Sequence, residues 1–207
     1  MLLLDCNFTK IDIGFLLDSS RSINSQGRMN YQILKDFIKA IVKSVKIGLN
    51  ETELGVATYS DFNKFQLHIN FSSYSNTSEI VKAVQRIPYD AGDTSTGNGL
   101  NRIRTELFSQ SRNGIPKILI VITDGQSQDS VETPSSSLRA MKVHIMSVGI
   151  GDVVYTQLAN MATDPGNQNV FTANFSSIHD VVGSIIENNC RGKCKMSLGG
   201  GGLWVFL

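Results

Sequence analysis

Apolar residues follow two different patterns along this chain. Continuous or alternating apolar runs of strand length occur at 11–17, 54–59, 64–69, 117–123, 143–150 and 169–172. Apolar residues at every third or fourth position, with polar residues between them, predict helices over 34–45, 80–87, 100–107, 131–140, 155–161 and 178–186. Strands and helices therefore take turns along most of the chain.

This order of elements predicts an α/β fold. We expect a doubly wound, mostly parallel, Rossmann-like sheet with helices on both faces. The runs at 117–123 and 143–150 are almost wholly apolar, as in central strands that are buried on both sides. The run at 64–69 alternates and predicts one short antiparallel strand at the edge of the sheet.

Oxygen-bearing side chains gather where the first apolar run ends. Asp18, Ser20 and Ser22 stand at i, i+2 and i+4, which places them on one side of an extended backbone. A carboxylate and two hydroxyls suit a hard cation such as Mg²⁺, which takes about six oxygen ligands and usually only one or two carboxylates from the protein. The same composition is also typical of turns and helix caps, so these residues alone leave both interpretations open.

Two further segments bring oxygen atoms to the same edge of the predicted sheet. Asp124 follows the central strand 117–123, and Thr94 lies in the small polar loop 91–100 that opens a helix. In parallel α/β sheets, ligands bind beyond the carboxyl ends of the strands. We therefore expect Asp124 and Thr94 to meet Asp18 there.

Composition limits the classes of function. The chain has 207 residues, 41% hydrophobic and 18% charged, with a net charge of +1, which is typical of one globular domain. No cluster of basic residues points to a nucleic-acid partner, and no apolar run approaches the roughly 20 residues of a membrane span. We expect a lead-in at 1–7, one domain at 8–188, and a Cys- and Gly-rich, disordered tail at 189–207.

The three cysteines lie outside the predicted core. Cys6 precedes the first strand and Cys190 follows the last helix, so a disulfide between them would join the two ends of the domain. The alternative is that both are free thiols. Cys194 is then left over, either free or paired with another chain.

Glycosylation sequons occur at five positions, which suggests a secreted or ectodomain protein. The asparagines are Asn7, Asn50, Asn70, Asn76 and Asn174.

Three elements now stand in order along the chain: Asp18-x-Ser20-x-Ser22, a threonine in the loop 92–97, and Asp124 within Ile-Thr-Asp-Gly. This combination resembles the von Willebrand factor type A domain, also called the integrin I-type domain. The resemblance covers residues 8–188. It implies a metal-ion-dependent adhesion site formed by Asp18, Ser20, Ser22, Thr94 and Asp124. Thr96 is the alternative to Thr94.

The resemblance also implies a function. The domain is expected to be an extracellular adhesion module that binds Mg²⁺ or Mn²⁺. Because the five ligands carry at most two negative charges, the ion still attracts an Asp or Glu carboxylate from a partner such as collagen or another matrix protein. The flanking cysteines resemble those of extracellular matrix members of the family.

Other functions fit the sequence less well. An enzyme is not expected, since the chain has no Gly-x-Ser-x-Gly elbow and no phosphate-binding loop, and its three histidines are scattered. A matrix-assembly module with an idle metal site remains open. An intracellular scaffold is the third alternative, against which the sequons and the bracketing cysteines argue.

Overall fold

A single six-stranded sheet forms the centre of the computed structural model, which describes residues 10–25 and 27–190. The strand order is β3-β2-β1-β4-β5-β6, and only β3 runs antiparallel to its neighbour. The strands are β1 (Asp12–Asp18), β2 (Glu53–Tyr59), β3 (Phe65–Ile69), β4 (Lys117–Thr123), β5 (Val143–Ile150) and β6 (Val170–Ala173). The predicted fold class, with its antiparallel edge strand, is confirmed.

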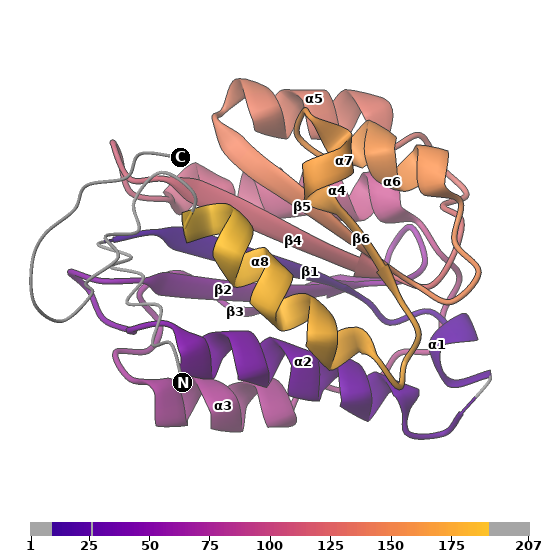
Figure 1. Ribbon diagram of the computed structural model, residues 1–207, viewed down its shortest axis with the longest axis horizontal. Coiled ribbons are helices and arrows are strands. Elements are labelled where there is room, and N and C mark those ends of the chain that lie inside the picture. The colour runs from indigo at the N-terminus through magenta and orange to yellow at the C-terminus, as the bar shows by residue number, and fades with distance from the viewer. Residues whose placement is uncertain (1–9, 26, 191–207) are drawn as a thin grey trace, which may run out of the picture.

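Helices cover both faces of the sheet, as Figure 1 shows with α2 and α3 below it and α4, α5 and α6 above it. The helices are α1 (Ser22–Ser25), α2 (Asn30–Ser44), α3 (Thr77–Gln85), α4 (Thr96–Glu106), α5 (Glu132–Ala140), α6 (Tyr155–Met161), α7 (Gly166–Asn169) and α8 (Val181–Cys190). Two single-turn 3₁₀ helices, Phe108–Gln110 and Ile178–Asp180, complete the set.

The alternation of side chains along the central strands divides the core into two parts. Phe15 and Leu17 of β1 pack with apolar residues of α2, α3 and α8 on one face. Leu16, between them, packs with residues of α4, α5 and α6 on the other face. Since both faces are covered, β1 and β4 are buried almost throughout, which explains their continuous apolar sequences.

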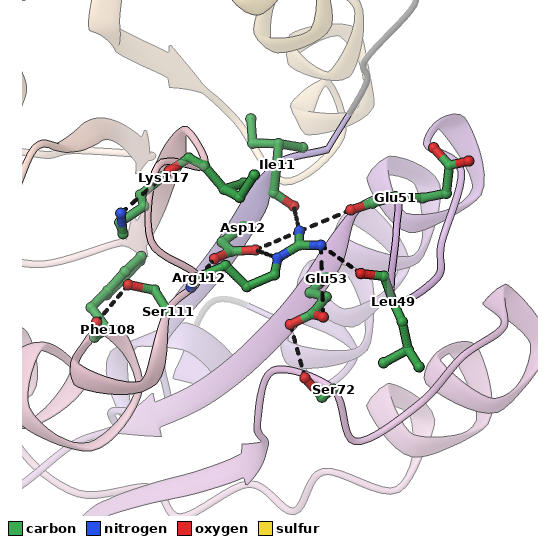
Figure 2. Close-up of polar contacts among 11 residues, drawn as sticks. Ile11, Asp12, Leu49, Glu51, Glu53, Ser72, Phe108, Ser111, Arg112 and Lys117 are labelled. Carbon is green, nitrogen blue, oxygen red and sulfur yellow. Dashed lines mark hydrogen bonds and ion pairs between the residues drawn. The ribbon is translucent and has the colours of Figure 1, made fainter.

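The amino-terminal edge of the sheet is held by one arginine, shown in Figure 2. The Arg112 guanidinium forms an ion pair with the fully buried carboxylate of Asp12, at 2.6 Å. It also donates to the carbonyl oxygens of Ile11, Leu49 and Glu51, at 3.1, 2.9 and 2.8 Å. Arg112 therefore joins the start of β1 to the segments before β2 and β4.

Local details differ from the sequence-based expectations at a few positions. α2 begins at Asn30, one turn earlier than predicted, and the short helices α1 and α7 were not predicted. Lys35 is buried, because its ammonium donates to the carbonyl oxygens of Gln85 and Ile87 at the end of α3. Asn76 caps α3, since its side-chain oxygen accepts a hydrogen bond from the Glu79 amide at 3.0 Å.

Within the described part of the chain, no helix has both the length and the apolar character needed to cross a membrane. The lead-in predicted at 1–7 and residues 191–207 of the predicted tail lie outside the described residues.

Candidate metal centre

The two predicted carboxylates lie at the carboxyl ends of neighbouring central strands. β1 ends at Asp18, and β4 ends at Thr123, directly before Asp124. The strands pair in parallel from Asp12 opposite Lys117 to Leu17 opposite Ile122, so both carboxylates reach the same edge of the sheet. Parallel pairing alone therefore brings together two residues that lie far apart in the sequence.

The Asp18 carboxylate is fully buried and accepts hydrogen bonds from neutral groups. The Ser20 amide donates to Oδ1 at 2.8 Å, and the hydroxyls of Thr123 and Tyr59 donate to Oδ2 at 2.7 and 3.3 Å. Burial has the largest effect on the pKa of Asp18 and raises it, although the hydrogen bonds act in the opposite direction. The charged form of Asp18 thus needs positive charge that these donors do not supply.

A chain of hydroxyls connects the Asp18 loop to Asp124. Ser20 Oγ lies 2.9 Å from Ser22 Oγ, and Ser22 Oγ donates to Asp124 Oδ1 at 2.7 Å. The pKa of Asp124 is raised to about 6: burial raises it most, the bond from Ser22 lowers it, and the negative charge of Asp18 raises it. Four of the five predicted side chains are therefore joined, directly or through the Ser20 backbone, by hydrogen bonds.

Thr94 approaches the same place, whereas Thr96 points elsewhere. A Cβ atom built on Gly125 would lie 3.6 Å from Thr94 Oγ1 and 3.9 Å from Ser22 Oγ, so the two hydroxyls border one small space beside Gly125. The Thr96 hydroxyl instead lies 3.0 Å from that of Tyr59, in the buried layer behind Asp18. The geometry favours Thr94 as the fifth oxygen.

Thr94 lies two residues before α4, and the amino terminus of this helix is held by the segment that follows Asp124. Asp129 accepts from the amides of Gly97 and Asn98 at 2.8 and 2.7 Å. Ser127 Oγ accepts from the Thr96 amide at 2.9 Å, and the Gln128 amide donates to the Thr94 carbonyl at 2.9 Å. Asp129 thus caps a helix that begins more than 30 residues earlier, and it fixes the start of that helix beside the site.

Four residues that contact the site were not predicted from the sequence: Asp129, Ser127, Thr123 and Tyr59. Asp129 has no local signal, because a cap is normally expected just before its own helix. Thr123 and Tyr59 resemble ordinary strand residues. Only the pairing of the strands shows that they face Asp18.

Hydrogen bonds also join the loop that follows β1 to the loop that precedes α4. The Arg21 amide donates to the Gly92 carbonyl at 2.8 Å, and the Ala91 amide donates to the Ser19 carbonyl at 2.9 Å. The exposed side chains of Arg21 and Asp93 form an ion pair at 3.2 Å. These contacts hold the loop of Ser20 and Ser22 against the loop of Thr94.

The site is chemically suited to a hard divalent cation. No ion pair among the described residues involves Asp18 or Asp124, although burial raises the pKa of both. The described part of the chain holds no group of three or more His, Cys, Asp or Glu residues that could hold a metal ion, so an ion at this site would depend on the hydroxyl oxygens beside the two carboxylates. Two carboxylates with three nearby hydroxyls fit an oxygen-seeking ion such as Mg²⁺ or Mn²⁺.

The remaining predicted residues lie away from this site. Asn50, Asn76 and Asn174 are exposed, and Asn70 is half-buried and donates from Nδ2 to Gln110 at 2.8 Å. Asn7, Cys6, Cys194 and the side chain of Cys190 lie outside the part that the structure describes. The disulfide therefore stays a prediction, as does glycosylation at the five asparagines.

Comparison with known proteins places this geometry in context. The sequence profile of the von Willebrand factor type A domain matches residues 12–184. The chain is 35% identical over 188 residues to the collagen alpha-5(VI) chain of Mus musculus, and 31% identical over 180 residues to vitrin of Homo sapiens. These matches cover 89% and 86% of the chain, but only 7% and 26% of the two relatives.

Solved structures that resemble this chain also come from a matrix protein. Proximal thread matrix protein 1 from the mussel byssus superimposes with a TM-score of 0.83 at 30% identity, covering 91% of this chain and 48% of that one. A second structure of that protein, described as having a zinc-occupied MIDAS motif, gives a TM-score of 0.82 at 31% identity, with 91% and 47% covered. The relatives are extracellular matrix proteins, which confirms the expected extracellular location, and no enzyme family is indicated among them.

Proposed function

The chain belongs to the von Willebrand factor type A domain family, and from this premise we propose that it is a non-enzymatic adhesion module that binds a partner carboxylate through a divalent cation. The ion is Mg²⁺ or Mn²⁺, and the partner is an extracellular protein such as collagen or another matrix protein. The side chains that hold the ion are Asp18, Ser20, Ser22, Thr94 and Asp124.

The observation that carries this proposal is the pair of carboxylates without a cationic partner. Asp18 and Asp124 lie at one sheet edge, within a cluster of hydroxyls, and no Lys or Arg of the described chain pairs with either. Leaving two such groups unpaired is costly, because burial disfavours their charged forms. A bound cation removes this cost.

Each residue has a separate task in this arrangement. Asp18 is buried and held on both oxygens, so it is the fixed carboxylate. Ser20, Ser22 and Thr94 add neutral oxygens, which leave the charge of the site low. The bound ion supplies an electrophilic position that a carboxylate oxygen from outside can occupy.

Two features outside the site complete the proposal. We infer a disulfide between Cys6 and Cys190 that joins the ends of a domain spanning 8–188, with Cys194 free or paired with another chain. The five sequon asparagines are proposed as glycosylation sites; three of the four described ones are exposed, consistent with this role.

Calorimetric titration with Mg²⁺ and with Mn²⁺ tests the metal site. The wild-type chain is expected to bind one ion, and Asp124→Asn, which keeps an oxygen for the Ser22 bond, is expected to lose that binding. Asp152→Asn is the matched control, because Asp152 is an exposed carboxylate in the loop that follows β5. Equal binding by wild type and Asp124→Asn would contradict the proposal.

Capture of proteins from an extracellular matrix extract tests the role of the ion. The wild-type chain with Mg²⁺ is expected to retain a partner that is released by chelator and is not retained by folded Asp124→Asn. Capture that chelator does not affect would instead support a matrix-assembly module with an idle metal site.

A further inference from the structure

A tyrosine outside the proposed ligand set contacts the loop that carries two of the ligands. The Tyr89 hydroxyl donates to the Ser20 carbonyl oxygen at 2.8 Å, across 69 positions of the sequence. Tyr89 lies between α3 and the loop of Thr94, and its half-buried ring packs against the part of the core that contains α2 and α3. It therefore joins this part of the core to the candidate metal centre.

Ser20 forms hydrogen bonds through its amide, its hydroxyl and its carbonyl. Its amide donates to Asp18 Oδ1 at 2.8 Å, and its hydroxyl lies 2.9 Å from that of Ser22. Its carbonyl accepts from the Ile23 amide at 3.3 Å and from the Tyr89 hydroxyl at 2.8 Å. Of these four partners, Tyr89 is the one that comes from a distant part of the chain. Its bond therefore fixes the Ser20 peptide group relative to the rest of the fold.

The backbone that follows Tyr89 is held against the same loop. The Asp90 amide donates to Ser19 Oγ at 2.9 Å, and the Ala91 amide donates to the Ser19 carbonyl oxygen at 2.9 Å. The segment therefore contacts the loop that follows β1 at Tyr89, Asp90 and Ala91 in succession. Since the backbone bonds fix the position of this segment, the Tyr89 hydroxyl meets the Ser20 carbonyl from a fixed direction.

A second tyrosine packs beside Tyr89 and offers a matched comparison. The rings of Tyr31 and Tyr89 lie 4.9 Å apart between centroids, at an angle of 43°. The Tyr31 hydroxyl donates to the Pro88 carbonyl oxygen at 2.9 Å. Both tyrosines therefore donate to a backbone carbonyl at nearly the same distance. Of the two acceptors, Ser20 belongs to the proposed ligand set and Pro88 does not.

The Tyr89 hydroxyl stays protonated at neutral pH, as a donor must. Its pKa is raised above the ordinary value of 10.0: burial raises it most, a hydrogen bond from the Asn24 backbone lowers it, and the charges of Asp124 and Asp18 raise it. The influence of both carboxylates shows that this hydroxyl lies within electrostatic reach of the candidate metal centre.

Precise placement of the ligands matters for the proposed ion. Mg²⁺ demands a nearly ideal octahedron of oxygens at about 2.0–2.1 Å, and loss of a group that orients a metal ligand typically weakens metal binding roughly 10–100-fold. We propose that the Tyr89 hydroxyl positions Ser20, and with it the loop that carries Ser22, for binding of the ion. This inference rests on the proposed function and adds to it a residue outside the ligand set.

Removal of single hydroxyl groups from the full chain tests this role. Tyr89→Phe keeps the ring and is expected to bind Mg²⁺ about tenfold more weakly than wild type in calorimetric titration. Tyr31→Phe is the matched control and is expected to bind Mg²⁺ as tightly as wild type does. In urea unfolding with chelator, both variants are expected to show similar small shifts of the midpoint, because each loses one hydrogen bond to a backbone carbonyl.

Amide hydrogen exchange of the metal-free proteins tests the position of the loop without any ion. In Tyr89→Phe, residues 19–25 are expected to exchange faster than in wild type and in Tyr31→Phe, because the Ser20 peptide group has lost its bond to a distant segment. Exchange in β4 is expected to be alike in the two variants, since neither hydroxyl contacts that strand. Mass spectrometry of peptides from the exchanged proteins resolves these segments.

The outcomes separate this inference from the proposed function. If wild type binds Mg²⁺ and Tyr89→Phe binds it equally well, the inference fails and the metal site stands. If Tyr31→Phe weakens Mg²⁺ binding as much as Tyr89→Phe does, the effect belongs to the packing of the two rings and the inference also fails. Unchanged exchange of residues 19–25 in Tyr89→Phe likewise overturns it. If wild type binds no Mg²⁺, the proposed function fails and this inference falls with it.

Discussion

Replacement of Asp124 by Asn should stabilise the metal-free protein. In the folded state, burial and the nearby charge of Asp18 raise the pKa of Asp124 from 3.8 to about 6. The unfolded chain releases this proton near the ordinary value. Between these two values the folded state holds more protons than the unfolded state, so the stability of the metal-free protein falls as the pH rises through this window.

The size of the effect follows from the shift. About two pKa units correspond to roughly 3 kcal/mol, and discounting for the partial exposure of Asp124 leaves about 1–2 kcal/mol at neutral pH. The amide that replaces the carboxylate carries no charge, and its oxygen can still accept from Ser22, so the variant avoids this cost. A domain of this size gains roughly 2–4 °C in melting temperature per kcal/mol.

Urea unfolding of wild type and Asp124→Asn in chelator measures the difference directly. We expect the variant to be more stable at about pH 7 and the two proteins to converge at about pH 4, where the difference in proton binding has little effect. With Mg²⁺ at neutral pH the order should reverse, because only wild type gains from the ion. Asp152→Asn is the exposed control. A variant that is no more stable in chelator, or equally favoured at both pH values, would refute the reasoning.

Three further changes test the scaffold by urea unfolding. Arg112→Met leaves the buried carboxylate of Asp12 without its cation and should lower the free energy of unfolding by about 3–5 kcal/mol. Adding Asp12→Asn should restore much of this loss. A loss no larger than that from replacing an exposed arginine would contradict the role of the ion pair. Gly55→Ala places a Cβ 2.6 Å from Leu107 Cδ2 and should lower the free energy of unfolding by about 1–3 kcal/mol. The loss should be smaller when Leu107→Ala is also present. If the effects of the two substitutions simply add, this contact is not responsible. Asp129→Asn removes one hydrogen-bond acceptor at the start of α4 and should lower the free energy of unfolding by about 1–2 kcal/mol. It should also weaken Mg²⁺ binding in calorimetry. Unchanged Mg²⁺ affinity would show that Asp129 does not position the site.

The elements of the fold could be predicted from the sequence because their signals are local. Continuous apolar runs at β4 and β5 and helical spacing in α2 and α8 depend on residues within one or two turns of each other. The short helices α1 and α7 have four residues each and contain no such period, which explains why they were not predicted. Lys35 has the pattern of a polar residue between apolar ones, but the end of α3 supplies carbonyl partners that bury it.

The residues of the candidate site also fall into those that the sequence identifies and those that only the structure places. Asp18, Ser20 and Ser22 are recognisable by their spacing at a strand end, and Asp124 by its place after a central strand. The preference for Thr94 over Thr96 depends on Gly125 and Tyr59, which reach the site from other strands. The sequence also favours Thr94, since it stands at the position after Gly-x that the resemblance to the family implies, with Thr96 two residues on as the alternative.

The sequence by itself determined the alternation of strands and helices and the oxygen-rich ends of two strands, since both depend on neighbouring residues. Only the tertiary structure decided the bonds that cross the chain. Ser22 meets Asp124 across 102 positions, Arg112 meets Asp12 across 100, and Asp129 caps α4 from 32 positions away. Such contacts depend on strand order and register, which place distant segments side by side by burying apolar faces on both sides of one sheet.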